Sequence, residues 1–270
     1  MDMIRTNNPV LSSGAFTESR AMGNLERADA MPRVMTVQGA AYSTLILMGV
    51  AFATAVFCWS FLQANTGLLW PATLIASLGG MVLVMITCFA PKASPWLALP
   101  IAIAQGVLAG GMSIMWSMYA ERSAAKGSGI VGQLGTGLVL QASLLTMGIA
   151  GGMLIAYVTR LVRATEKFKM AVVAATMGIC FVAVVSMVLR MFGVQIPYLW
   201  DNGIVGIGFA GFVVVVAALN LVLDFDRIEQ GAERGLPKYM EWLSAIGLLV
   251  TLVWLYVSIL RLLAMLNSRR

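Results

Sequence analysis

The chain has 270 residues, of which 60% are hydrophobic and only 11% are charged. Soluble globular domains carry about 25% charged residues, so this composition excludes an ordinary water-soluble fold. The formal net charge is +6, but the basic residues stand in short clusters between long apolar runs. That pattern indicates orientation in a membrane and argues against nucleic acid as a partner.

The first 39 residues mix arginines with acidic residues and contain no apolar stretch that could form the core of a signal peptide. Pro9 and Pro32 argue against one continuous helix through this segment. We therefore predict a cytoplasmic N-terminal tail over residues 1–39 and a transmembrane domain over residues 40–270.

Apolar runs begin near residue 42, and each approaches or exceeds the roughly 20 residues that a helix needs to cross a bilayer. They predict an all-α, polytopic membrane protein with about seven transmembrane helices. Two pairs of glycines at four-residue spacing, Gly106 with Gly110 and Gly148 with Gly152, predict close approach of neighbouring helices. The predicted spans are 42–62, 69–90, 96–119, 131–157, 170–192, 203–223 and 242–264.

The distribution of Lys and Arg predicts the orientation. With the N-terminus inside, the tail and the second, fourth and sixth connections carry four, one, four and three of them, which makes twelve, against six on the other side. The positive-inside rule therefore favours a cytoplasmic N-terminus. A seventh segment that crosses would place the C-terminus outside, and one that re-enters would place it inside; the sequence leaves both open.

Catalytic chemistry is poorly supported. The sequence contains no histidine, which removes the usual general base and the commonest zinc ligand. Cys58, Cys88 and Cys180 lie in apolar runs without CxxC spacing, so they indicate neither disulfides nor a metal site. We expect a protein that is not an enzyme and carries no cofactor, and the sequence identifies no metal ligand set.

Ionisable residues within or beside membrane spans are costly, and each is a functional candidate for that reason. Carboxylates at the mouth of a span could hold a hard cation such as calcium. Alternatively, they belong to a solvated loop and pair with Arg227, Arg234 and Lys238. The densest group comprises Asn220, Asp224, Asp226, Glu229, Glu233 and Glu241.

Proton sensing is a second chemical interpretation of the same region, because an apolar environment disfavours the charged form of a carboxylate. Asp224 is the best candidate, since it closes the sixth predicted span. Arg190 and Arg261, both near span ends, are the candidate counter-charges.

Four stretches carry a resemblance to a known family: NPVLSSGAF at 8–16, LVRATEKFK at 161–169, AALNLVLDFDRIEQGAERGLPKYMEW at 217–242 and LLVTLVWLYVSILRLLAML at 248–266. With these, the chain resembles the bacterial Bax inhibitor-1/YccA-like membrane proteins over nearly its whole length. The resemblance implies a Bax inhibitor-1-like fold, in which six helices surround a hydrophobic central seventh. It also implies a calcium leak that responds to pH.

In better understood members of the wider family, aspartates on the sixth and seventh helices share a proton, and an arginine on the second helix joins them. Asp224 matches the first aspartate, whereas the second position falls on Ser258, and the second span contains no arginine. Either Glu241 or Asp226 substitutes for the missing carboxylate, or this latch is absent. The missing carboxylate also argues against an aspartyl intramembrane protease.

The expected function is thus a pH-influenced leak for calcium or other cations in a bacterial-type inner membrane, with Asp224, Asp226, Glu241 and Ser258 as the ion- or proton-sensing residues. The family resemblance supplies an alternative: a regulator that binds and restrains a membrane-anchored ATP-dependent protease through its N-terminal tail. A secondary transporter would show inverted repeats, and no convincing internal repeat is present.

Overall fold

Helices account for nearly all of the computed structural model, which describes residues 34–124, 134–162, 164–193 and 203–268. Seven α-helices in this part of the chain are long and apolar enough to cross a membrane, which confirms the predicted all-α polytopic architecture. Short 3₁₀ turns, η1 (Thr66–Leu68) and η2 (Pro91–Ala93), precede the second and third of them. The helices are α2 (Val37–Ala64), α3 (Leu69–Phe89), α4 (Ser94–Ala124), α5 (Leu134–Val158), α6 (Glu166–Met191), α8 (Ile204–Glu233) and α9 (Met240–Asn267).

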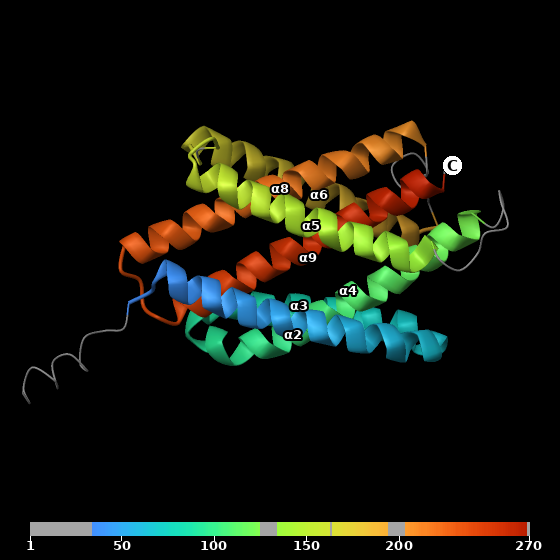
Figure 1. Cartoon of the computed structure of the whole chain (residues 1–270), viewed down its shortest axis with the longest axis horizontal. Coiled ribbons are helices and arrows are strands. Elements are labelled where there is room, and N and C mark those ends of the chain that lie inside the picture. Colours follow the sequence, from blue (N-terminus) through green and yellow to red (C-terminus); the bar gives the residue numbers. More distant parts are fainter. Residues whose placement is uncertain (1–33, 125–133, 163, 194–202, 269–270) are drawn as a thin grey trace, which may run out of the picture. The chain divides into compact units, whose positions relative to one another are not determined.

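The chain divides into an N-terminal unit ending at Val34 and a second unit that starts at Met35 and contains all of these helices. Most of the tail predicted over residues 1–39 therefore lies outside the described residues. Within the second unit, α9 is central, because it packs against α2, α4, α5 and α8. The main contacts of α3 are with α4, and those of α6 are with α8. Figure 1 shows α9 running between the group α2–α3–α4 and the group α5–α6–α8.

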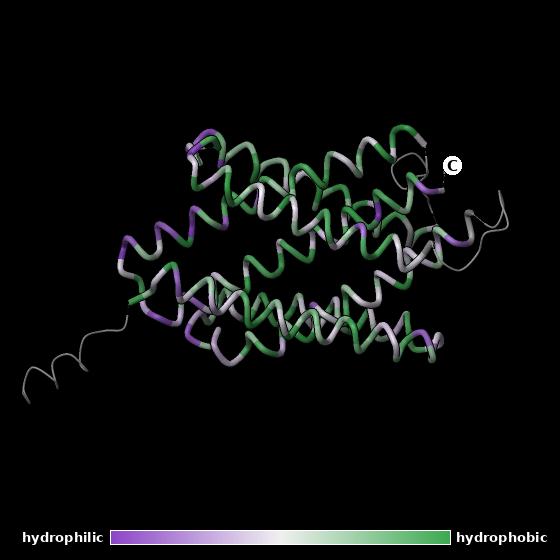
Figure 2. Tube along the Cα trace, in the orientation of Figure 1, coloured by the Kyte–Doolittle hydropathy of each residue, from purple (hydrophilic) through white to green (hydrophobic). Residues whose placement is uncertain are grey.

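The outer surface of the bundle is apolar along most of its length. Phe52, Ile75 and Phe181 are 69%, 71% and 69% exposed, respectively. So much exposed hydrocarbon would be unfavourable in water but is favourable against lipid chains. Figure 2 shows hydrophobic residues along the helices and hydrophilic residues gathered towards their ends. The exposed apolar surface therefore agrees with a transmembrane position.

α9 runs for 28 residues, about 42 Å at 1.5 Å per residue, which is longer than the hydrocarbon core of a bilayer. Of the two alternatives for the seventh segment, the structure thus shows a helix that crosses the whole bundle. Its two ends lie at opposite ends of the bundle (Figure 1).

One glycine pair was predicted correctly, and the other was not. A Cβ atom at Gly106 or Gly110 would meet the backbone of α2 at Ala51 or Ala55, so both glycines allow α4 to approach that helix closely. At Gly148 and Gly152 there is nothing within 4 Å of an added Cβ. Four-residue spacing identifies a flat strip on a helix but does not say whether a neighbour covers it.

The sixth helix is longer than its apolar run. α8 continues beyond residue 223 to Glu233, so Asp224, Asp226 and Glu229 lie on a helix instead of in a loop. Polar pairs one turn apart support this extension: Gln230 donates to Asp226 at 2.6 Å, and Arg234 donates to Gln230 at 3.1 Å. The helix ends where Gly235 adopts φ +61° and Leu236 N–H donates back to Gly231 at 3.1 Å.

Candidate functional site

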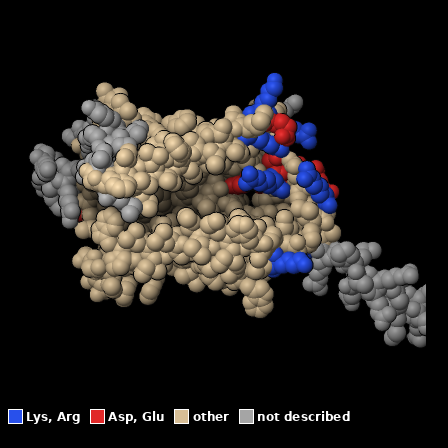
Figure 3. Space-filling model, turned by 180° about the vertical axis from the view of Figure 1, so that it is seen from behind, with Lys and Arg blue, Asp and Glu red and all other residues tan. Residues whose placement is uncertain are grey.

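Charged side chains gather at the end of the bundle where α2 and α9 begin and α8 ends (Figure 3). The acidic residues that the sequence places close together lie on different faces of their helices. In an α-helix, positions two residues apart are about 200° apart around the axis. Asp224 and Asp226 accordingly point towards different neighbours, and each must be considered with its own partners.

Asp224 is buried on α8, with 9% of its surface exposed. Arg227, one turn later, places Nη1 3.6 Å from Asp224 Oδ1. The Thr251 hydroxyl of α9 lies beside the carboxylate and interacts with it, and it also donates to the carbonyl oxygen of Gly247 at 3.1 Å. Within the described part of the chain, no hydrogen bond reaches the buried Oδ2 atom of Asp224. Asp224 therefore keeps an open acceptor position at the contact between α8 and α9.

Asp226 faces α6 instead. Its Oδ2 atom lies 2.8 Å from Lys169 Nζ and accepts a hydrogen bond from Gln230 at 2.6 Å. Lys169 also lies 3.3 Å from Glu166, which is mostly exposed. These contacts satisfy the charge of Asp226 locally, so this residue holds the start of α6 against α8.

Two further polar residues of α8 contact two other helices. Glu229 accepts a hydrogen bond from the Tyr157 hydroxyl at the end of α5. Asn220, one turn before Asp224, donates to Thr176 of α6 at 2.8 Å and to the carbonyl oxygen of Val216 at 2.9 Å. The polar residues of α8 thus fasten it to α5 and α6.

Glu241 is the most buried described acid, at 4% exposed. It stands in the first turn of α9 and accepts hydrogen bonds from the backbone N–H and the hydroxyl of Thr36, both at 3.0 Å. Thr36 in turn caps α2 by accepting from Gly39 N–H at 2.9 Å. Glu241 therefore lies at the first turns of both α2 and α9, where the helix dipoles favour negative charge.

Ser258 and Arg261 lie further along α9 than Thr251, which faces Asp224. Ser258 is buried on α9 and donates to the Trp254 carbonyl oxygen at 2.8 Å. Arg261 is ten positions after Thr251 on the same helix, which corresponds to about 15 Å along the axis. The side chain of Arg190, near the end of α6, lies outside the described residues. Of the basic residues in the described part of the chain, Arg227 is the one paired with Asp224.

The sequence did not identify three residues that contact the acids. Thr36 contacts Glu241, Lys169 contacts Asp226, and Thr251 contacts Asp224. Thr36 carried a usable signal, because Thr is a favoured N-cap directly before an apolar helix. The other two carried none, since a lysine or threonine near a span end identifies no particular neighbour.

The arrangement does not bring several acids to one point. Among the described residues, no group of three acidic or cysteine side chains is placed to hold a metal ion. The open oxygen of Asp224 can accept one proton or contribute one ligand to a passing cation. This chemistry suits transient binding better than a closed metal site.

Comparison with known proteins gives a family and no individual relative. Residues 8–268 match a family described as Bax inhibitor 1 like. No curated protein and no solved structure matches the sequence.

Proposed function

The chain belongs to the Bax inhibitor 1 like family, and from this premise we propose that it is a non-enzymatic, pH-influenced leak for calcium or other cations, with Asp224 as its titrating group. The observation that supports the proposal is the buried Oδ2 atom of Asp224, which has no hydrogen-bond partner in the described structure. A buried charge without a full set of partners is costly and is retained where it has a role.

The surroundings of Asp224 suit transient contact with a cation. Arg227 is 71% exposed and lies 3.6 Å from the carboxylate, so solvent screens this pair and a competing cation can displace it at modest cost. Figure 3 shows a hollow along one face of the bundle, with charged atoms at one end of it. Acidic and basic side chains both lie at this end (Figure 3), so the Asp224 carboxylate, and not the net charge of the mouth, is the group that would attract a cation.

In this proposal, Asp224 works with Arg227 and without a second carboxylate. The neighbouring position on α9 is Thr251, and the position suggested by the resemblance is Ser258. Neither hydroxyl can share a proton as a second carboxylate would. Asp226 forms an ion pair with Lys169, and Glu241 accepts a hydrogen bond from Thr36. We therefore assign a structural role to those two acids and the pH response to Asp224 alone.

The test is calcium flux into liposomes that contain the purified full-length protein, measured at about pH 6 and about pH 8. Wild-type protein should give different rates at the two pH values. Asp224→Asn should give one rate at both, because the amide does not titrate in this range. Asp226→Asn is the matched control on the same helix, since its carboxylate faces Lys169, and it should keep the pH difference.

Arg227→Gln should shift the pH response without removing it, because it deletes the counter-charge and leaves the titrating group. An unchanged pH response in Asp224→Asn would overturn the assignment of Asp224. No flux above that of empty liposomes would overturn the leak itself. It would favour the alternative function, a regulator of a membrane-anchored protease. Co-purification of such a protease with the full chain would test that alternative.

We also propose a bacterial-type inner membrane and a cytoplasmic N-terminus. Lys92, Arg160, Lys169 and Lys238 all lie at the end of the bundle where α2 begins, and the positive-inside rule places that end in the cytoplasm. Single cysteines placed at residues 92 and 238 in a cysteine-free background should be protected from an impermeant thiol reagent in intact cells. Labelling of both would reverse the orientation.

A further inference from the structure

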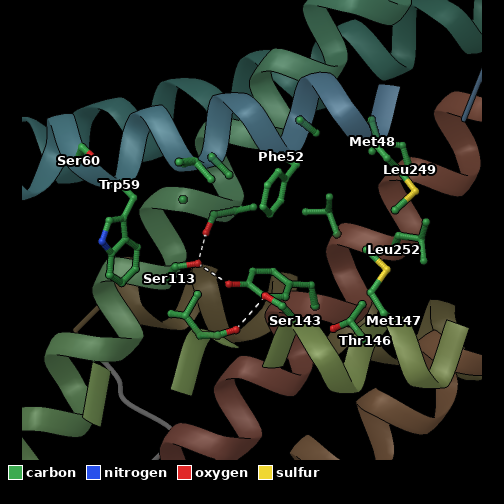
Figure 4. A pocket seen from close by; sticks show the side chains of 18 residues that line it. Met48, Phe52, Trp59, Ser60, Ser113, Ser143, Thr146, Met147, Leu249 and Leu252 are labelled. Carbon is green, nitrogen blue, oxygen red and sulfur yellow. Dashed lines mark hydrogen bonds between the residues drawn. The ribbon is translucent and has the colours of Figure 1, made fainter. Parts of the chain in front are cut away.

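A cavity of about 310 Å³ lies between α2, α4, α5 and α9, apart from the acidic residues (Figure 4). Leu249, Leu252 and Tyr256 of α9 line it, whereas Thr251 of the same helix faces Asp224. The cavity and the Asp224 carboxylate therefore occupy different sides of α9. Its volume is at the lower end of the range for small-molecule sites.

The cavity opens sideways between α2 and α5. Phe52 and Val56 of α2 and Met147 of α5 line it, yet they are 69%, 54% and 57% exposed. The main contacts of α2 and α5 are with α4 and α9. Since α2 and α5 are both membrane spans, the opening faces lipid chains, and a ligand would enter from the bilayer.

Hydroxyl groups from three helices meet at the base of this apolar cavity. Ser113 of α4 lies 2.6 Å from the Tyr256 hydroxyl of α9, and Ser143 of α5 interacts with the same tyrosine. In Figure 4, the Ser113 and Ser143 side chains are seen among the lining residues. Sequence spacing gives no hint of this cluster, because Ser113 and Tyr256 are 143 positions apart.

The hydrogens of these hydroxyls are already directed at protein atoms. Ser113 donates to the Ala109 carbonyl oxygen at 2.6 Å, and Ser143 donates to the Val139 carbonyl oxygen at 2.8 Å. Either hydroxyl can donate in the contact between Ser113 and Tyr256. With the one Ser113 hydrogen on the Ala109 carbonyl oxygen, Tyr256 is the donor. In this arrangement the cluster offers lone pairs to the cavity, and it can recognise a hydrogen-bond donor.

The depth of the hydroxyl cluster in the membrane limits which hydrogen-bond donor it can bind. Tyr256 comes 15 positions after Glu241 on α9, which is about 22 Å from the charged end of the bundle. That depth lies within the hydrocarbon layer, where a phosphate or another charged headgroup is strongly disfavoured. A small uncharged donor on a hydrophobic molecule fits both the depth and the acceptor chemistry.

From these observations we infer that the cavity binds a long-chain hydrophobic molecule of the bilayer that carries a hydroxyl group. Its chain occupies the apolar space between α2 and α5. Its hydroxyl donates its one hydrogen to an oxygen atom of the cluster formed by Ser113, Ser143 and Tyr256. This site is independent of the leak proposed for Asp224.

The experiment uses the full chain in lipid nanodiscs and two photoreactive probes, a long-chain alcohol with a diazirine in its chain and the methyl ether of the same molecule. The alcohol carries a hydroxyl hydrogen, and a methyl group replaces that hydrogen in the ether. We expect the alcohol to label the cavity segments of α2 and α5 roughly 3- to 10-fold more than the ether, the usual effect of one hydrogen bond. Tyr256→Phe should reduce labelling by the alcohol towards the level of labelling by the ether. Ser143→Ala, which removes a different acceptor, should do the same if the tyrosine variant fails to fold.

Ala109→Phe should reduce labelling by both probes, because Ala109 lines the cavity and a larger side chain fills it. Leu144→Phe is its control, since Leu144 is 73% exposed on α5 and is absent from the lining. Equal labelling by alcohol and ether would overturn recognition of the hydroxyl. Labelling that survives Ala109→Phe would overturn the site. Asp224→Asn should leave the labelling unchanged, so failure of the leak proposal and failure of this one are distinguishable.

Discussion

Removal of the Glu241 carboxylate should release the start of α2 from the rest of the bundle. Glu241 is 4% exposed and accepts two hydrogen bonds from Thr36. Glu241→Ala deletes both of them and leaves the Thr36 N–H to find another partner. Glu241→Gln keeps the shape of the side chain and one acceptor oxygen but loses the charge, so its effect should be smaller.

The magnitude follows from the two hydrogen bonds. A hydrogen bond to a charged group contributes about 1.5–3 kcal/mol. Because Thr36 is exposed and can reach water, we take the lower value for each bond and expect a loss of about 3 kcal/mol for Glu241→Ala. For Glu241→Gln we expect about half of that, because the bonds persist with a neutral acceptor.

Hydrogen exchange of the Thr36 and Gly39 amides is the direct assay, since one donates to Glu241 and the other to the Thr36 hydroxyl. A loss of 3 kcal/mol in local stability corresponds to roughly 100-fold faster exchange. Glu233→Ala is the control, because Glu233 is an exposed acid at the end of α8. Exchange at Thr36 that stays as slow in Glu241→Ala as in the wild type would refute the reasoning.

A double-mutant cycle with Gly39→Ala makes the same test more demanding. A Cβ atom at Gly39 would overlap the Glu241 carboxylate, so Gly39→Ala should destabilise the wild-type protein. In the Glu241→Ala background, the overlap is gone and alanine is the better helix former, so the cost should vanish. Additive effects of the two substitutions would contradict the contact between them.

Four other substitutions test the packing of the helices. Gly110→Val should destabilise the protein by about 1–3 kcal/mol through overlap with α2, whereas Gly148→Val should cost little. Thermal unfolding in detergent compares the two variants. Equal effects would contradict the different surroundings of these glycines. Gly235→Ala should cost about 1 kcal/mol in the same assay, because the residue has φ +61°, and an unchanged melting temperature would argue against that conformation. Lys169→Met should speed amide exchange at the start of α6 by removing its ion pair with Asp226, and exchange as slow as in the wild type would show that the pair does not hold this helix.

The sequence by itself determined the class of the protein, the number of spans and the family. Long apolar runs cross a bilayer as helices, because a helix pairs the backbone N–H and C=O groups within its own segment. The same information identified Asp224 as an unusual charge in apolar surroundings and Gly106 with Gly110 as a close-packing strip. These are local properties, and they can be read without knowing which helices are neighbours.

Only the tertiary structure decided what each polar side chain meets. Helical periodicity shows that Asp224 and Asp226 face different ways, but it does not show that one faces α9 and the other Lys169 of α6. It assigns no partner to Glu241, which holds Thr36 from 205 positions earlier. The hydroxyl cluster of Ser113 and Tyr256 is equally invisible along the chain. The physical reason is that the apolar faces of the helices are similar, so the pairing of helices depends on the packing of the whole bundle.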